Sequence, residues 1–177
     1  SVYYNHYYHS SILQSTQKKK LKKIKLVITD VDGVLTDGGM YYSKDGESLK
    51  KFNTRDAMGM ELLLNKGIKT IMLTRENSDI VKTRAKKIKV SKLYSGILDK
   101  NKQLKKILEE YRLSTEQIAY IGDDVNDLEI MKSVGFSCSP NDGIKQIQII
   151  SDYVCKLNGG DGVFREFADI IISCQTN

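Results

Sequence analysis

The 177-residue sequence has one proline, three cysteines, no tryptophan and no long hydrophobic run. Its 40% hydrophobic content excludes a disordered or collagen-like chain. The apolar runs are far shorter than the ~18 residues of a membrane-spanning helix, and none resembles the apolar core of a secretory signal. The cysteines are widely spaced and form no C-x-x-C pair. This spacing argues against a disulfide framework or a zinc site and favours a reducing, cytoplasmic location.

Positive charge is concentrated in one short tract. The six lysines between residues 18 and 25 equal the whole formal net charge of +6, and the first 25 residues contain no acid. We interpret residues 1–23 as a flexible basic leader and residues 24–177 as one folded domain. A lysine tract can contact nucleic acid or an anionic membrane. The balanced charge of the remaining chain gives no reason to expect either partner.

From residue 24 onward, β-branched runs alternate with helical patterns. Strands are expected at 24–29, 68–73, 92–94, 118–121 and 135–138. Helices are expected at 55–66, 78–88, 101–111, 128–134, 142–150 and 163–173, with a capped turn at 114–117. An Asp-Gly pair at 45–46 predicts a β-hairpin over residues 38–52. The pattern predicts an α/β fold with a Rossmann-like parallel sheet, helices on both faces and a small hairpin flap.

Polar side chains follow three of the expected strands. Asp30 and Asp32 follow the first, Thr74 the second and Asp123 the fourth. In parallel sheets, ligands bind where the carboxyl ends of the strands meet. Clustered carboxylates repel each other unless a cation lies between them, and ligands restricted to oxygen favour magnesium over zinc. We therefore predict a Mg²⁺ site formed by Asp30, Asp32 and Asp123.

The same residues suit phosphoryl transfer. Asp30 would attack phosphorus as a carboxylate nucleophile. Asp32, just beyond the strand, would donate a proton to the leaving oxygen and then take one from water. Thr74 would bind a phosphoryl oxygen, and Lys100 would neutralise developing charge.

These residues resemble the four ordered motifs of the haloacid dehalogenase-like phosphohydrolases. The matching positions are Asp30-x-Asp32-Gly33-Val34-x-Thr36-Asp37, Thr74, Lys100 and Gly122-Asp123-Asp124-x-x-Asp127. The resemblance covers roughly residues 24–173 and implies a magnesium-dependent phosphatase with an aspartyl-phosphate intermediate. The roles of Asp124 and Asp127 stay open between holding the loop or a metal-bound water and capping a helix.

More specifically, the sequence is similar to the capless branch that includes the 3-deoxy-D-manno-octulosonate (KDO) 8-phosphate phosphatases. The segments that carry this similarity are 30–38, 52–56 and 159–166. No insertion between the motifs is long enough for a cap domain. The resemblance implies a homotetramer in which the hairpin and the glycine-rich C-terminal segment of neighbouring subunits help to close the site.

The resemblance implies KDO 8-phosphate as the substrate but leaves a second sugar acid open. The expected Gly-Arg pair after Thr74 is replaced by Arg75–Glu76. Glu76 and Lys87 resemble a pair in relatives that act on nine-carbon acids such as 2-keto-3-deoxynononate (KDN) or N-acylneuraminate 9-phosphate. The implied substrate-binding residues are Thr54, Arg55, Glu76, Lys87 and Arg165. A non-catalytic domain associated with a sialic acid cytidylyltransferase is the remaining alternative, although every catalytic motif position is filled.

Overall fold

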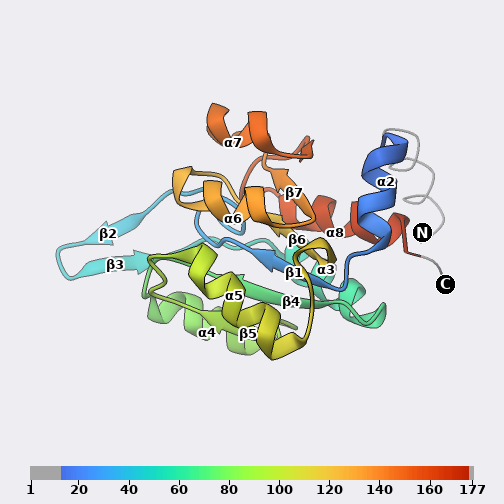
Figure 1. The fold of residues 1–177 in the computed structure, drawn as a ribbon. Helices are drawn as coiled ribbons and strands as arrows, with labels where there is room; N and C mark the ends of the chain where they lie inside the picture. Colours follow the sequence, from blue (N-terminus) through green and yellow to red (C-terminus); the bar gives the residue numbers. More distant parts are fainter. Residues whose placement is uncertain (1–12, 176–177) are drawn as a thin grey trace.

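A six-stranded parallel sheet forms the centre of the computed structural model, which describes residues 13–175 (Figure 1). Its strands are β1 (Leu26–Thr29), β4 (Lys69–Leu73), β5 (Lys92–Tyr94), β6 (Ile118–Ile121), β7 (Phe136–Ser139) and β8 (Tyr153–Val154). They lie in the order β5-β4-β1-β6-β7-β8, and every neighbouring pair is parallel. The predicted α/β fold is therefore confirmed, with β1 near the middle of the sheet.

Helices cover both faces of this sheet (Figure 1). The helices are α3 (Thr54–Asn65), α4 (Asp79–Lys87), α5 (Lys100–Tyr111), α6 (Leu128–Ser133), α7 (Lys145–Ile150) and α8 (Val163–Ser173), with the 3₁₀ turns η1 (Thr115–Gln117) and η2 (Val125–Asp127). Successive side chains of β1 point to opposite faces of the sheet, so the core has two parts. Val27 packs in the cluster with α3, α4 and α8, and Ile28 packs in the cluster with α5, α6 and α7. No helix within residues 13–175 is long and apolar enough to cross a membrane.

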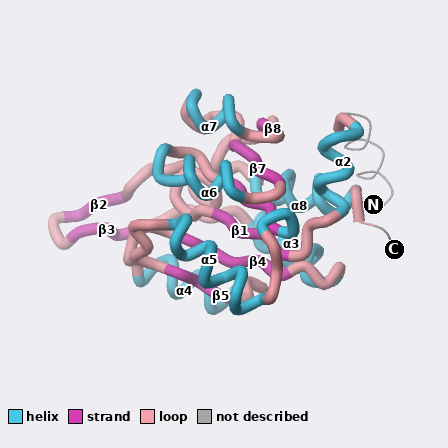
Figure 2. Tube along the Cα trace, viewed as in Figure 1, coloured by secondary structure: helices cyan, strands magenta, loops and turns pink. Residues whose placement is uncertain are grey.

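The predicted hairpin is present and projects from the body (Figure 2). Its antiparallel strands are β2 (Tyr41–Ser43) and β3 (Gly46–Leu49). Gly46 has a φ of 110°, which glycine adopts without a steric penalty. Large apolar side chains of the hairpin face solvent, with Tyr42 66% and Leu49 64% exposed. The hairpin therefore presents an apolar surface that this single chain does not cover.

The N-terminal segment differs from the expected flexible leader within the part that the structure describes. Helix α2 (Ser15–Lys22) packs on the domain, and its Leu21 is completely buried. The Nζ of Lys20 lies 2.7 Å from Asp152, and the Gln17 side chain donates to the Asp152 carbonyl. One buried leucine and the polar contacts with Asp152 hold this helix, and the lysine-rich composition of the tract gave no sign of that packing. Residues 1–12 lie outside the described range.

Two further elements differ from the sequence prediction. The helix expected from residue 142 begins at Lys145, because the Asp142 carboxylate accepts the Gly159 N–H at 3.0 Å and a turn occupies Pro140–Gly143. Strand β8 was not predicted, since two residues are too short to show a period.

Candidate active site

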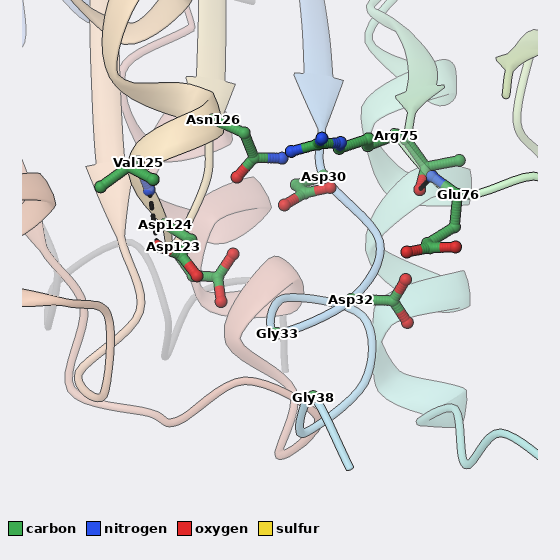
Figure 3. Close-up of a pocket in the computed structure, with 11 residues that line it drawn as sticks. Asp30, Asp32, Gly33, Gly38, Arg75, Glu76, Asp123, Asp124, Val125 and Asn126 are labelled. Atoms are coloured by element: carbon green, nitrogen blue, oxygen red, sulfur yellow. Dashed lines mark hydrogen bonds between the residues drawn. The ribbon is translucent and has the colours of Figure 1, made fainter. Parts of the chain in front are cut away.

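A cavity of about 300 Å³ lies at the carboxyl ends of β1, β4 and β6 (Figure 3). Its lining residues are Asp30, Asp32, Gly33, Gly38, Thr74, Arg75, Glu76, Asp123, Asp124, Val125 and Asn126. The loops that follow the three strands thus bring residues from three distant segments to one place. This is the edge at which the sequence places its catalytic residues.

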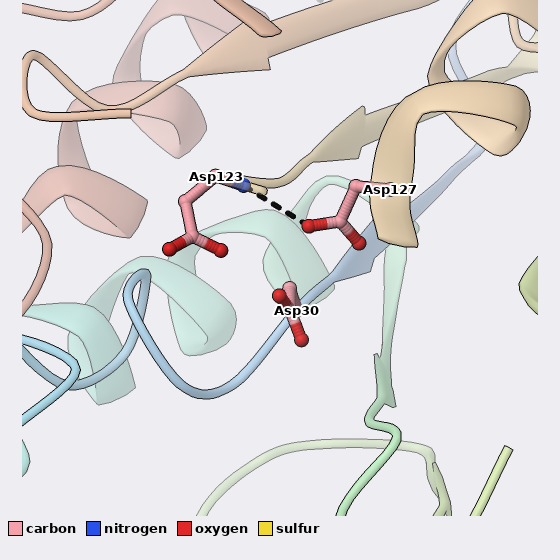
Figure 4. Close-up of side chains that lie close together, drawn as sticks. All are labelled: Asp30, Asp123 and Asp127. Carbon is pink, nitrogen blue, oxygen red and sulfur yellow. Dashed lines mark hydrogen bonds between the residues drawn. The ribbon is translucent and has the colours of Figure 1, made fainter. Parts of the chain in front are cut away.

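Two carboxylates that line this cavity, those of Asp30 and Asp123, meet a third from the fully buried Asp127 (Figure 4). Asp30, Asp123 and Asp127 each offer an oxygen, and these oxygens lie within 4.8 Å of one another. Burial, reinforced by the charge of Asp127, raises the pKa of Asp30 well above its ordinary value and that of Asp123 to about 7. A divalent cation would remove this repulsion, so the cluster fits a hard metal ion.

Lys100 lies behind the cluster and is buried with it. Its Nζ is 3.0 Å from Asp30 Oδ1 and 2.7 Å from Asp127 Oδ1. Burial opposes a charged lysine, but the two carboxylates raise its pKa above the usual range. Asp99 caps the N-terminus of α5 directly before Lys100. The helix start therefore delivers a fixed cation to the Asp30 side chain.

The structure separates the roles that stayed open for Asp124 and Asp127. The buried Asp127 carboxylate accepts N–H groups from Asp123 at 3.0 Å and Asp124 at 3.4 Å, and the Tyr120 hydroxyl also donates to it. Asp124 instead caps η2 by accepting the Val125 N–H at 2.7 Å. Asp127 thus holds the loop that carries Asp123, and Asp124 serves as the cap.

Asp32 lines the cavity but lies outside the three-carboxylate cluster. Figure 3 places it and Asp123 on opposite sides of Asp30. Its Oδ1 is 2.6 Å from the Nζ of Lys50. Of the three ligands that the sequence suggests, the structure therefore gathers Asp30 and Asp123, with Asp127 as the third carboxylate. Nothing in the sequence pairs Lys50 with Asp32, because the two residues come from different loops.

Thr74 is buried beside the cavity at the end of β4. Its hydroxyl oxygen accepts the Glu76 N–H at 3.2 Å, which leaves the hydroxyl proton available to a ligand. The neighbouring Arg75 is the one cationic side chain among the lining residues of this cavity, and Figure 3 shows it reaching toward Asn126. From the sequence, Arg75 was noted only as a departure from the family pattern and was given no role in the site.

Of the five implied substrate-binding residues, Glu76 alone lines this cavity in the described chain. Thr54 and Arg55 are exposed at the start of α3, and Lys87 is exposed at the end of α4. Arg165 lies along α8 with its Nε 3.1 Å from Asp169. These four side chains are not brought together at the carboxylate cluster within a single subunit.

The glycine-rich C-terminal segment supports the loop after β1 from within the same chain. The Gly160 N–H donates to the Val34 carbonyl at 3.0 Å, and the Asn53 side chain donates to the Gly160 carbonyl at 3.3 Å. A Cβ at Gly159 would collide with the Gly33 carbonyl. Glycine at residue 159 is therefore required by close backbone packing near the site.

The chain matches a family model described as haloacid dehalogenase-like hydrolase over residues 65–167. It is also 36% identical over 158 residues to the KDO 8-phosphate phosphatase of Haemophilus influenzae, covering 89% of this chain and 88% of that protein. The chain belongs to the haloacid dehalogenase-like hydrolase family. The family agrees with the resemblance that the sequence motifs suggest.

Solved structures of this family share the fold. The cobalt-bound deoxy-D-mannose-octulosonate 8-phosphate phosphatase of H. influenzae has a TM-score of 0.85 at 36% identity, over 88% of this chain and 91% of that one. The Moraxella catarrhalis KDO 8-phosphate phosphatase, in complex with magnesium, phosphate and KDO, has a TM-score of 0.88 at 34% identity, over 92% and 94%. This haloacid dehalogenase-like protein is thus a phosphatase, a phosphoric monoester hydrolase.

Proposed function

We propose that this protein is a magnesium-dependent phosphatase that hydrolyses KDO 8-phosphate to KDO and phosphate. The observation that carries the proposal is the cluster of Asp30, Asp123 and Asp127, two of which line the cavity. The relatives named for this substrate, which match the chain along most of its length, support the sugar-acid assignment. We also propose a cytoplasmic location and a homotetramer whose neighbouring subunits complete the site.

The protein's own side chains divide the reaction into two steps. Asp30 attacks phosphorus and forms an aspartyl-phosphate while the sugar alkoxide leaves with a proton from Asp32. Water then attacks the same phosphorus, Asp32 accepts its proton, and the Asp30 carboxylate is released. The Thr74 hydroxyl binds a phosphoryl oxygen, and Lys100 offsets the charge around Asp30.

The Mg²⁺ ion would be held by Asp30 and Asp123, with the Asp127 carboxylate in the same cluster, while Asp32 lies outside this cluster and keeps its acid–base role. When bound, it neutralises phosphoryl charge and allows the anionic substrate to approach a site rich in carboxylates. The raised pKa values of Asp30 and Asp123 support this assignment, because burial and the neighbouring charge of Asp127 both disfavour the ionised carboxylates, which a bound cation would stabilise.

A nine-carbon substrate, KDN or N-acylneuraminate 9-phosphate, is the second candidate. It is favoured by Glu76, whose carboxylate lines the cavity where the octulosonate branch has an arginine. For either acid we assign Thr54, Arg55, Lys87 and Arg165 to the substrate site across subunit contacts, since none of the four lines the cavity of a single chain.

A steady-state substrate panel tests the proposal. We expect the highest kcat/KM with KDO 8-phosphate, lower values with the two 9-phosphates, and loss of all activity when magnesium is removed by chelation. A higher kcat/KM with a 9-phosphate would show that the nine-carbon acid, and not KDO 8-phosphate, is the substrate. A preference for phosphoserine would contradict the sugar-acid assignment, and full activity without a divalent ion would contradict the metal site.

A further inference from the structure

A buried ion-pair network lies beside the carboxylate cluster and involves a lysine that the mechanism above does not use. Lys50 directly follows β3 at the base of the hairpin, and its side chain is only 1% exposed. Its Nζ lies 2.6 Å from Asp32 Oδ1 and 3.3 Å from Glu47 Oε2. Burying a lysine is costly unless carboxylates compensate it, so this position is held by the two acids around it.

The network joins three separate segments. Asp32 belongs to the loop after β1, and Lys50 and Glu47 belong to the hairpin. The Ser78 hydroxyl, which caps α4, donates to Glu47 Oε1 at 3.2 Å. The N-terminus of α4 therefore holds Glu47, and Glu47 restrains Lys50 on one side. Lys50 in turn restrains Asp32 on its other side.

We propose that Lys50 is a positioning residue that fixes the Asp32 carboxylate for the second step, hydrolysis of the aspartyl-phosphate. This inference rests on the proposed two-step reaction. The ion pair engages Oδ1 of Asp32, while no hydrogen bond within residues 13–175 engages its Oδ2. One oxygen is thus anchored, and the side chain as a whole is 30% exposed and lines the cavity, where water can reach it.

The chemistry of the second step matches this arrangement. The water oxygen bonds to phosphorus, the bond between phosphorus and Asp30 breaks, and the water proton passes to Asp32. The ion pair fixes the orientation of the Asp32 carboxylate, so that its second oxygen can take the proton of the attacking water. Without Lys50, Asp32 loses its anchor, and the aspartyl-phosphate is expected to persist.

The test uses p-nitrophenyl phosphate, because its leaving group departs without needing a proton. In Lys50→Met we expect kcat to fall about 10- to 100-fold. KM should fall with it, so kcat/KM, which reports the steps up to Asp30 phosphorylation, should stay within about threefold of wild type. Rapid mixing should then release one p-nitrophenol per active site in a burst, and acid quenching should trap a phosphoryl group on the Asp30 peptide for mass spectrometry.

A matched control and a second variant sharpen the experiment. Lys51→Met removes the adjacent exposed lysine and should leave every one of these quantities unchanged. Glu47→Gln weakens the restraint on Lys50, so kcat and KM should fall together by a smaller factor than in Lys50→Met. This variant replaces Lys50→Met in the test if Lys50→Met does not fold. A parallel loss of kcat and kcat/KM without a burst or a trapped phosphoenzyme, in whichever variant folds, would overturn the inference. So would a raised KM at unchanged kcat, which would make Lys50 a substrate ligand.

The same experiment keeps the two proposals apart. If the wild-type enzyme hydrolyses the aryl phosphate without any phosphoryl group ever forming on Asp30, the two-step reaction itself fails, and the inference fails with it. If wild type follows the two steps and Lys50→Met does not accumulate the intermediate, the role of Lys50 alone is wrong.

Discussion

The proposed role of Asp30 as the nucleophile depends on the charged groups around its carboxylate. It is buried with Lys100 3.0 Å away and with two further carboxylates in the same cluster. An isolated carboxylate in this position would be costly to ionise. The lysine and a metal ion together provide compensating charge, which makes Asp30 available as a nucleophile.

Gly33 determines how closely the loop after β1 approaches Asp123. Its φ is 85°, and a Cβ there would collide with the Asp123 carboxylate. We expect Gly33→Ala to lower the free energy of unfolding by about 1–3 kcal/mol more than its control, and to lower kcat. The control is Gly67→Ala, since Gly67 has a φ of 76° and no atom within 4 Å of the added Cβ. Equal losses of stability in denaturant titrations would show that the contact with Asp123 is unimportant.

Asp56 should make stability depend on pH. Burial raises its pKa from 3.8 to about 7, and its Oδ2 lacks a hydrogen-bond partner among the described residues. The folded state therefore binds this proton more tightly than the unfolded state. The contribution of Asp56 to stability is fully present below about pH 4 and is lost as pH rises to about 7, a difference of about 4 kcal/mol.

Asp56→Asn isolates this effect, because the amide cannot ionise. We expect the unfolding free energy of the variant, relative to wild type, to increase as pH rises from 4 to 8. Denaturant titrations across this range provide the measurement. A constant difference between the two proteins would mean that Asp56 does not titrate in this range.

Individual site residues were predictable where strand ends determine their position. Asp30, Thr74 and Asp123 each follow a strand of clear sequence pattern, and all three line the cavity. Lys50 and Arg75 were missed, since a lysine at the base of a hairpin and an arginine in a loop have no periodic signal. Their placement depends on tertiary contacts that the local sequence does not encode.

Elements with a strong local pattern were predictable almost to the residue. Strands β5 and β6 and helix α8 have the predicted bounds. Helix α2 was not predicted because its eight residues contain a single buried side chain, Leu21, among four lysines. Its packing on the domain comes from Leu21 in the core and from contacts with Asp152, which is distant in sequence.

Leu21 tests whether α2 is part of the folded domain. Because its side chain is fully buried, Leu21→Ala should lower the free energy of unfolding by about 2–5 kcal/mol. The adjacent Lys22 is exposed, so Lys22→Ala should change it by no more than about 0.5 kcal/mol. Similar small values for both variants in thermal or chemical unfolding would indicate a leader that is not docked.

At the scale of the whole molecule, the proposed assembly is argued from the exposed hairpin. Tyr42 and Leu49 remain exposed, and four of the implied substrate residues lie away from the cavity. Apolar patches of this kind often mark an interface. The homotetramer was suggested by resemblance alone, because no local pattern in the sequence marks which residues would contact a neighbouring chain.

Light scattering on the purified protein tests this assembly. We expect the mass of four chains for wild type and smaller species with reduced kcat/KM for Tyr42→Glu, since a charge would be buried in the contact. Ile149→Glu is the control, because Ile149 is 71% exposed on α7, away from the hairpin. A wild-type monomer with full activity would exclude a shared site.

Replacement of Asp30 tests the central claim most directly, because every proposed step passes through its carboxylate. In Asp30→Asn we expect kcat for magnesium-dependent phosphate release from KDO 8-phosphate to fall by at least about 1,000-fold, while circular dichroism shows an intact fold. A variant that folds normally and retains a kcat near that of wild type would contradict the account.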